Sequence, residues 1–511
     1  MTKSKQLFIN LSTTLVGLVI NTLISFGLSK YIVATIGEEA YGFVSLANSF
    51  IMYATILTVA VNSMASRFIT LSMQRGEIET ANKYFSSVLI SNAVIIGVLI
   101  VPATVLIAWL ENIINISSEL VTDVKLLFFF IILNFFVSLI GGVFSVATYC
   151  TNKLHLTSLR TMESNVIKAL VIVSLFVLFK PAVFYIGVAT LISGSYVVLF
   201  NMRYTKQLLP DIKIKSRNFE LNKIKILLSS GVWNSITNLG NVLSDGLDLI
   251  ISNLAVNPAT MGIVALAKTP GNVINTVMSS ISNVFQPQII SFYSQNDIDG
   301  VLAETKQSMK ITGVFGNIPF AYIVVFGYAF GRIWVPEVDA VLLHRLLILT
   351  FLNIFCGGVI SSLYNVFTIT NRVKGNAILN VGSGFLSTVL VFLLISVTNL
   401  GVYAIVGVSA FVGLLKGFLV IPVLAARCLK VPNKTFFGVI IKYFFSTAIL
   451  VAILYALKCF MVIDGWIPLI ISVLVSGILG VLVDYFVLFS GSDRKRFMYI
   501  FISKFKEKGN E

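Results

Sequence analysis

Long apolar runs alternate with short polar or charged segments along the whole chain. A helix needs about 20 apolar residues to cross a bilayer, and on that basis the runs predict about 14 transmembrane helices. Their expected limits are 9–34, 42–66, 84–110, 125–149, 160–179, 182–202, 226–253, 260–291, 309–334, 342–368, 377–397, 400–425, 436–460 and 466–490. The pattern therefore predicts an all-α polytopic membrane protein with short outer loops and no interposed soluble domain.

The composition supports the same class. Hydrophobic residues make up 57% of the 511 residues and charged residues only 12%, which is more apolar surface than a soluble protein of this size needs. The net charge is +15, but the basic residues occupy short loops between apolar runs instead of forming one patch. We therefore expect membrane lipids around the chain and no nucleic-acid partner.

The basic residues favour one set of loops. These loops lie at 67–83, 153–160, 203–225, 306–310, 372–374 and 427–434, together with both ends of the chain. The opposite loops are poor in lysine and arginine and are often acidic, as at Glu38 and Glu39. Because cytoplasmic loops carry the excess of positive charge, both termini are predicted to be cytoplasmic. An even number of helices agrees with this orientation.

The two halves of the chain are related in sequence. With an offset of 220 positions, residues 41–48 (YGFVSLAN) align with residues 261–268 (MGIVALAK), and residues 76–79 fall on 296–299 without a gap. The gapless run argues against a chance similarity of two apolar hairpins. Six predicted helices separate the copies, so both copies have the same orientation in the membrane. Transporters built from such parallel repeats place the substrate between the halves.

The longest polar connection, the basic loop at 203–225, is the natural boundary between the halves. We predict an N-terminal six-helix lobe at 1–210 and a C-terminal six-helix lobe at 211–430. Two extra transmembrane helices and a basic cytoplasmic tail follow at 431–511.

Two predicted helices, 226–253 and 260–291, carry polar stripes. The stripes comprise Asn234, Asn238, Asn241, Asp245 and Asp248 on the first and Lys268, Asn272, Asn275, Ser279 and Asn283 on the second. Steps of three and four residues place each set on one helical face. Charges at membrane depth are costly and face a bundle interior or a watery cavity. Either a salt bridge between Asp245 and Lys268 holds the hairpin together, or the stripes line a translocation path.

Polar residues also follow the first and second predicted helices. The repeat makes Asn21 equivalent to Asn241 and Asn48 equivalent to Lys268, so the charge belongs to the second copy alone. We expect the first, second, seventh and eighth helices to line a shared polar cavity. A further cation, Lys168, lies near the middle of the fifth predicted helix, where it has little room to reach the membrane surface.

No motif for catalysis or cofactor binding is present. The sequence has no P-loop and no Ser/His/Asp or Cys/His grouping, and its four cysteines lack metal-binding spacing. We therefore expect no enzymatic activity, no metal and no cofactor.

Several segments together resemble a known group. They are Gly37-Glu-Glu-Ala-Tyr-Gly-Phe43, Ser66-Arg67, and the run from Asp248 through Met261-Gly262 to Phe285-Gln-Pro287. With the repeat and the extra helix pair, they resemble the multidrug/oligosaccharidyl-lipid/polysaccharide exporter superfamily, in its branch of O-antigen and capsule flippases. The resemblance implies a bacterial inner-membrane protein of surface polysaccharide (lipopolysaccharide or capsule) biosynthesis. It further implies alternating-access flipping of an undecaprenyl-pyrophosphate-linked oligosaccharide repeat unit, with the polysaccharide polymerase machinery as a partner.

A pyrophosphate binds cations and amide donors, and a sugar binds hydrogen-bonding groups. The residues expected to contact such a substrate are Lys268, Lys168, Asn21, Asn48, Asn234, Asn241 and Asn272, and those expected to act in coupling or gating are Asp245 and Asp248. Two alternatives stay open: an ion-coupled multidrug antiporter of the same superfamily, and a non-transporting membrane partner of a cell-envelope assembly complex. An antiporter of cationic drugs would need a dominant buried acid in the N-terminal half. This chain has Ser25 and Asn48 in its N-terminal hairpin instead, which counts against the antiporter.

Overall fold

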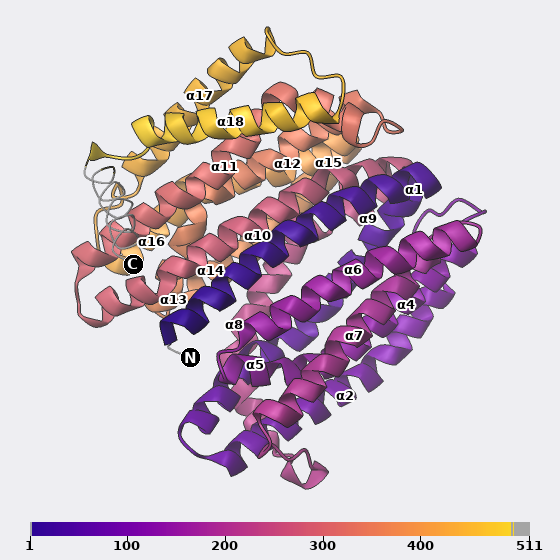
Figure 1. Cartoon of the computed structure of the whole chain (residues 1–511), viewed down its shortest axis with the longest axis vertical. Coiled ribbons are helices and arrows are strands. Elements are labelled where there is room, and N and C mark those ends of the chain that lie inside the picture. Colours follow the sequence, from indigo (N-terminus) through magenta and orange to yellow (C-terminus); the bar gives the residue numbers. More distant parts are fainter. Residues whose placement is uncertain (1–2, 492–493, 495–511) are drawn as a thin grey trace, which may run out of the picture. The chain divides into compact units, whose positions relative to one another are not determined.

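The computed structural model describes residues 3–491 and Arg494, and this part of the chain contains helices and no strand (Figure 1). The helices are α1 (Lys3–Gln74), α2 (Ile78–Ala108), α3 (Leu110–Ile113), α4 (Val121–Gly142), η1 (Val143–Ser145), α5 (Val146–Cys150), α6 (Leu154–Leu178), α7 (Phe184–Leu208), η2 (Ser216–Asn218), α8 (Leu221–Asn241), η3 (Val242–Gly246), α9 (Asp248–Ala255), α10 (Pro258–Ser294), α11 (Ile298–Trp334), α12 (Ala340–Ile360), η4 (Ser361–Leu363), α13 (Tyr364–Ile369), α14 (Val373–Val397), α15 (Val402–Leu415), η5 (Lys416–Val420), α16 (Ile421–Leu429), α17 (Phe437–Lys458) and α18 (Trp466–Val487). The described residues include 11 helical segments long and apolar enough to cross a membrane. The predicted all-α polytopic membrane fold is therefore confirmed.

Each predicted span corresponds to a helical segment, but two boundaries differ from expectation. The loop expected at 35–41 is wrong, because α1 covers both of the first two predicted spans. Its one non-helical residue is Gly37, with φ of 84°. Glycine adopts positive φ without a steric penalty, so the chain kinks within a single residue and Glu38 and Glu39 remain helical.

The second difference concerns the predicted span at 226–253, which is not a continuous helix. It consists of α8, the π-helical segment η3 and α9. A π-helical turn holds more residues than an α-helical turn, so the stripe's spacing of three and four does not continue through it. The five polar residues therefore do not share one face: Asp245 is exposed, whereas Asp248 is 4% exposed.

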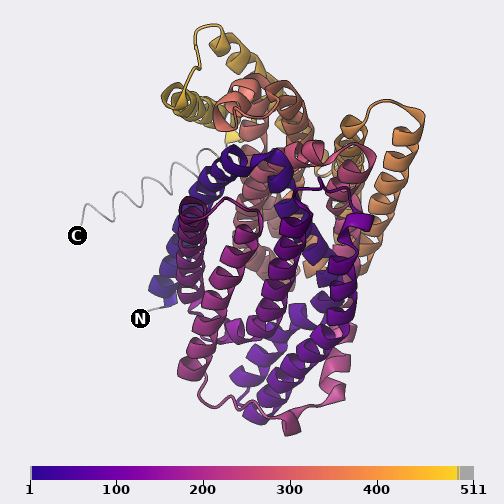
Figure 2. The same ribbon diagram turned by 90° about the vertical axis from the view of Figure 1, so that its right-hand side faces the viewer.

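The chain forms two compact units. The first comprises Met1–Leu266 and Lys374–Ile405, and the second comprises Ala267–Val373 and Val406–Glu511. In the first unit α7 packs against both α4 and α6, and the three helices run side by side (Figures 1 and 2). The lobe boundaries at 210 and 430 stay a prediction.

Four tight turns support the internal repeat. Gly76 and Asn296, aligned by the offset of 220, both have positive φ, of 74° and 59°. At an offset of 219, one residue shorter, Asn152 aligns with Asn371, and these two residues have φ of 54° and 53°. In all four turns the N–H of the following residue donates to a carbonyl of the preceding helical turn, as in a Schellman motif.

Helix packing repeats in the same way. A Cβ atom added to Gly194 would lie 2.0 Å from Oδ1 of Asn134, and one added to Gly413 would lie 2.1 Å from Oδ1 of Asn353. The two pairs occupy equivalent positions, α4 against α7 in the first copy and α12 against α15 in the second. Each glycine thus makes room for an asparagine of the neighbouring helix, so the repeat extends to side-chain packing.

A close approach within the first unit joins two residues that the repeat makes equivalent. A Cβ atom added to Gly42 of α1 would lie 2.8 Å from Cα of Gly262 in α10. A Cβ atom added to Gly262 would lie 2.0 Å from the backbone oxygen of Glu38. Equivalent residues meet in this manner beside a two-fold axis, so Gly42 and Gly262 lie next to a local pseudo-two-fold axis.

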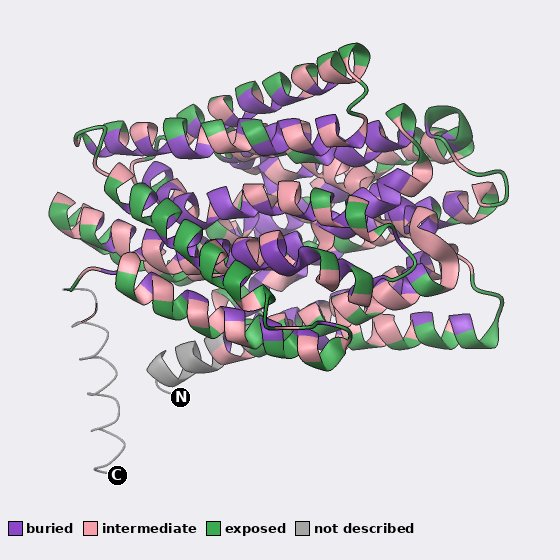
Figure 3. Cartoon of the chain, turned by 90° about the horizontal axis from the view of Figure 1, so that it is seen from above, coloured by how far each residue is buried: buried purple, intermediate pink, exposed green. Residues whose placement is uncertain are grey.

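Many helices carry exposed residues on one side and buried residues on the other (Figure 3). On α2, the exposed side includes Val94, Val98 and Val101, spaced by four and three residues. A contiguous exposed apolar stripe of this kind is typical of a helix that faces lipid.

Candidate functional site

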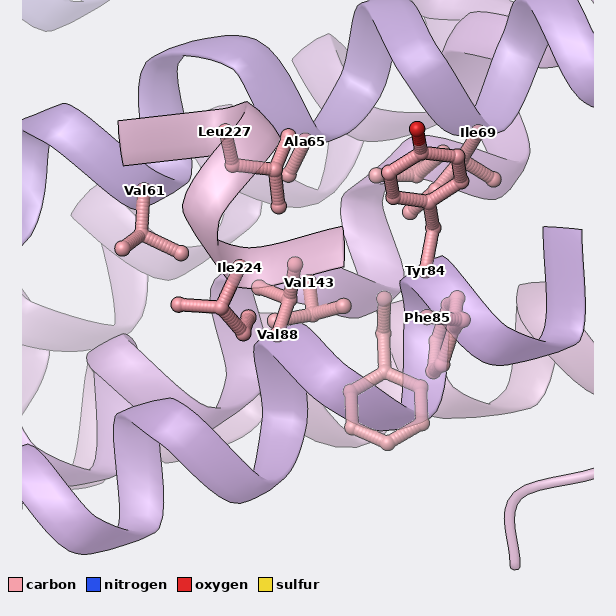
Figure 4. Packing of buried hydrophobic residues seen from close by; sticks show 11 residues of the cluster. Val61, Ala65, Ile69, Tyr84, Phe85, Val88, Val143, Ile224 and Leu227 are labelled. Atoms are coloured by element: carbon pink, nitrogen blue, oxygen red, sulfur yellow. The ribbon is translucent and has the colours of Figure 1, made fainter. Parts of the chain in front are cut away.

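The candidate site is built around the broken helix α8–η3–α9 in the first unit. Its N-terminal end is anchored in an apolar cluster, where Ile224 and Leu227 pack with Val61 of α1 and with Phe85 and Val88 of α2 (Figure 4). All five side chains are buried. Burial of apolar area is the main stabilising contribution here, and it fixes where α8 starts.

Polar contacts at the same end fix the loop that precedes α8. Oγ of Ser87 accepts a hydrogen bond from the backbone N–H of Glu220 at 2.9 Å. The carboxylate of Glu220 forms an ion pair with Nζ of Lys83 at 2.9 Å. The hydrogen bond from Lys83 lowers the pKa of Glu220 below its usual value. The basic loop at 203–225 is thus tied to α2 immediately before α8 begins.

Along α8, glycine and polar residues bring it close to the second half of α1. A Cβ atom added to Gly231 would lie 1.9 Å from the backbone oxygen of Ala60. Three side-chain hydrogen bonds follow along the contact: Asn234 Nδ2 to Ser63 Oγ at 3.1 Å, Ser235 Oγ to Ile56 O at 2.8 Å, and Asn238 Nδ2 to Thr55 Oγ1 at 3.1 Å. Much of the polar stripe on α8 therefore holds two helices together.

The π-helical break is supported from two neighbouring helices. The hydroxyl of Tyr53 in α1 donates to the carbonyl of Gly246, and Oγ1 of Thr388 in α14 donates to the carbonyl of Leu243 at 3.0 Å. Carbonyl groups released by a break in a membrane helix need such partners. Transporters commonly form their substrate and ion sites at broken helices of this kind.

The break places its two acids in different surroundings. Asp245 lies within η3 and is exposed, and Asp248 begins α9 and is buried. Asp245 lies ten residues before Ala255, the last residue of α9. At about 1.5 Å per residue this is roughly 15 Å, or about half the thickness of the hydrocarbon core. An acid at that depth is a candidate coupling residue.

Tyr53→Phe is expected to destabilise the first unit by about 1–3 kcal/mol, because it leaves the Gly246 carbonyl without its donor. Thr388→Val, which removes the other donor while retaining a similar shape, should have a comparable effect. The measurement is thermal unfolding of the purified variants in detergent. Thr104→Val is the control, because among the described residues the Thr104 hydroxyl bonds only to the carbonyl of Ile100 in its own helix, at 2.8 Å. Melting of Tyr53→Phe at the wild-type temperature would show that the break does not depend on Tyr53.

A second polar group lies between α1 and α6. Nδ2 of Asn165 donates to Oδ1 of Asn21 at 2.7 Å. Lys168 follows one helical turn later on α6 and is half-buried. In the described part of the chain Lys168 forms no ion pair and no hydrogen bond. The structure therefore brings together two predicted site residues, Asn21 and Lys168, through Asn165.

Arg160, two turns before Lys168, differs sharply in its contacts. Its guanidinium forms an ion pair with Glu163, and it donates to the hydroxyl groups of Tyr204 at 3.0 Å and Tyr196 at 3.2 Å. It also lies over the ring of Phe200. Arg160 is thus a structural cation that joins α6 to α7, whereas the charge of Lys168 has no such partners.

The remaining predicted site residues are more dispersed. Asn48 is exposed and donates to the carbonyl of Val44 in its own helix at 2.8 Å, and Asn241 is exposed at the end of α8. Lys268 is half-buried and Asn272 is exposed, both on α10 in the second unit. The helix α10 continues through Pro270. The pairing of Lys268 with Asp245 stays a prediction.

Sequence reasoning missed three residues that shape this site. Tyr53 and Thr388 were not among the predicted site residues, and only the folded structure shows that they support the break. Asn165 could have been found, because it precedes Lys168 by three residues in an apolar run. Residues three apart lie on one helical face.

Known proteins resemble this chain in sequence and in fold. The sequence model of the polysaccharide biosynthesis protein family matches residues 7–293. The chain belongs to this family. A curated relative, the uncharacterized membrane protein EpsK of Bacillus subtilis (strain 168), is 25% identical over 464 residues, which cover 90% of each chain.

Solved structures show the same fold. The lipid II flippase MurJ in an inward closed conformation matches with a TM-score of 0.69 and 16% identity, covering 93% of this chain and 98% of that one. A multidrug resistance MATE transporter of the MOP superfamily, facing inward, matches with a TM-score of 0.62 and 16% identity, covering 83% and 98%. The chain is therefore a multi-pass membrane protein of the polysaccharide biosynthesis protein family, and it shares the fold of these solved structures.

Proposed function

We propose that this protein flips an undecaprenyl-pyrophosphate-linked oligosaccharide repeat unit across the bacterial cytoplasmic membrane by alternating access, for surface polysaccharide biosynthesis. The observation that carries the proposal is Lys168, a half-buried cation with no partner among the described residues, beside the Asn21–Asn165 amide pair. A cation without a partner at membrane depth is costly, and an anionic headgroup would offset that cost when it binds.

The chemistry of the site fits this substrate class. A pyrophosphate carries several acceptor oxygens, and charge-assisted hydrogen bonds to it are stronger than neutral ones. Lys168 supplies the positive charge, and the neighbouring amides supply uncharged donors and acceptors for sugar hydroxyls. Lys268 on α10 is the second proposed headgroup contact, and Asn48, Asn234, Asn241 and Asn272 are proposed sugar contacts.

The broken helix supplies the proposed moving element. Asp245 lies in the π-helical break and Asp248 begins the next segment. A break that is held by side-chain hydrogen bonds from neighbouring helices can adopt a second arrangement when those bonds are exchanged. We propose that Asp245 and Asp248 act in coupling or gating, and that the loaded and empty states differ in the partner of Lys268.

The proposed orientation follows from the basic loops. Both termini and the loop at 203–225 are placed in the cytoplasm by the positive-inside rule. Substrate is then loaded from the cytoplasmic leaflet, and the polysaccharide polymerase machinery is the proposed consumer on the outer side.

Depletion of the protein in its host tests the proposal. Lipid-linked oligosaccharide is expected to accumulate, with its sugar accessible only from the cytoplasmic side, while surface polymer disappears. Mass spectrometry of extracted lipids and lectin labelling of oriented vesicles provide the measurement. A non-transporting assembly partner would instead leave the accumulated sugar on the outer side. A multidrug antiporter would raise drug sensitivity without accumulation of any lipid-linked sugar.

A further inference from the structure

A buried carboxyl group lies where α18 meets α11 and α17 in the second unit. Asp484 is 1% exposed and is the one charged residue of α18. Its Oδ1 accepts hydrogen bonds from Nδ2 of Asn317 in α11, at 2.7 Å, and from Oγ of Ser446 in α17. Both donor residues have no exposed surface. Three helices therefore meet at one carboxyl group.

Two atoms of this cluster have no hydrogen-bond partner among the described residues. They are Oδ2 of Asp484 and Oδ1 of Asn317, on the two side chains that the hydrogen bond already joins. With Asp484 ionised, both atoms are acceptors that lack a donor, which is costly for buried polar groups. One proton on Oδ2 satisfies both, because Oδ2–H can donate to the amide oxygen of Asn317.

The surroundings also favour the neutral acid. Asp484 forms no ion pair with any described lysine or arginine, including those of α11 and α17. It lies in the last turn of α18, where the helix dipole is negative and disfavours a further negative charge. The titratable group that faces it is Tyr443 of α17, whose hydroxyl donates elsewhere, to the carbonyl of Phe355 at 2.8 Å. The adjacent Lys442 is exposed.

The three helices are too tightly packed to rearrange freely around a new charge. A Cβ atom added to Gly480 of α18 would lie 2.5 Å from Cγ1 of Ile318 in α11. A Cβ atom added to Gly316 of α11 would lie 2.6 Å from the hydroxyl oxygen of Tyr443. Ionisation of Asp484 must therefore be accommodated by loosening this contact.

We propose that Asp484 and Asn317 form a proton-binding site that makes the packing of α17 and α18 on α11 dependent on pH. In the proposed site Asp484 holds its proton on Oδ2 and is the neutral carboxylic acid. Release of its proton to water breaks the Oδ2–H bond and leaves a carboxylate buried among the three helices. Asp484 lies in the helix pair outside the repeat and Asn317 lies on α11 within it, and the site does not depend on the proposed transport activity.

Infrared spectroscopy of the full-length protein in nanodiscs tests protonation directly. At neutral pH the wild type should show the carbonyl band of a protonated carboxylic acid, shifted in heavy water, and Asp484→Asn should lack it. Glu119→Gln, which changes an exposed acid, is the control and should retain the band. A wild-type spectrum identical to that of Asp484→Asn in this region would overturn the proposal.

Thermal unfolding gives a second test that does not depend on the band. An asparagine at position 484 can reproduce the neutral acid, with its amide NH₂ in place of Oδ2–H, so Asp484→Asn should melt at or above the wild-type temperature. The folded wild type binds one more proton than the unfolded chain, so its folding equilibrium constant should fall with rising pH, by up to about tenfold per pH unit. Asp484→Asn should lose this dependence, and Glu119→Gln should keep it. A less stable Asp484→Asn with the wild-type pH profile would contradict the site.

Discussion

Lys168→Gln is expected to abolish export of surface polymer while leaving the amount of folded protein unchanged or higher. The substitution removes a half-buried cation that has no partner among the described residues, so the folded state loses nothing and avoids the cost of an isolated charge. Binding of an anionic headgroup loses a charge-assisted hydrogen bond worth about 1.5–3 kcal/mol. That loss corresponds to a fall in affinity from about tenfold to somewhat over a hundredfold.

The measurement combines two readouts on the same cells. Complementation of a deletion strain reports polymer export, and fluorescence-detected size exclusion of the solubilised protein reports the folded amount. Lys168→Arg should retain part of the activity, because it keeps the charge with a different geometry. Lys268→Gln, at the second proposed headgroup contact, should also reduce polymer export.

Arg160→Gln is the matched control on the same helix. It removes a cation that is paired with Glu163 and bonded to two tyrosines of α7. We expect it to lower the folded amount and the activity together, because it leaves Glu163 without its cation. Normal export by Lys168→Gln, or a parallel loss of folded protein and export in that variant, would show that Lys168 does not bind the headgroup.

Gly262→Leu is expected to destabilise the protein by about 3 kcal/mol or more, at or beyond the usual range for overpacking. The reason is the nature of the atom that the new side chain meets. Its Cβ would lie 2.0 Å from the backbone oxygen of Glu38 and 2.5 Å from the backbone carbon of the same residue. A backbone cannot swing aside as the end of a flexible side chain can, so α1 and α10 must separate.

Two further variants complete this experiment: one at Gly42, the equivalent of Gly262 in the repeat, and one at Gly97, a glycine with free space around it. Gly42→Leu should have an effect of the same kind, because its Cβ would lie 2.8 Å from Cα of Gly262. Gly97→Leu on α2 is the control, because no atom lies within 4 Å of its added Cβ; leucine has the higher helix propensity, so this variant should be neutral or stabilised. Melting temperatures in detergent distinguish them. Equal stability of Gly262→Leu and Gly97→Leu would show that the close approach does not constrain the fold.

Part of the candidate site could be found from sequence, and part could not. Lys168 was identified because a cation inside an apolar run is rare and costly, and that reasoning needs no neighbours. That Lys168 lacks a partner could not be found in this way. Arg160 on the same helix has partners because Tyr204 of α7 and Glu163 lie beside it, and this depends on how the helices pack. Asp484 was not singled out at all, although it lies in an equally apolar run, because one acid near a helix end is ordinary until its buried surroundings are known.

The sequence by itself determined the membrane class, the approximate spans and the repeat. Each of these depends on local composition or on comparison of the chain with itself, and the meeting of Gly42 with Gly262 agrees with the offset of 220 positions. Only the tertiary structure decided that helix 226–253 is broken at η3, because the carbonyls of Leu243 and Gly246 find their donors on α14 and α1, far away in sequence. A break costs backbone hydrogen bonds unless distant side chains replace them, and no local pattern records which distant side chains will be near.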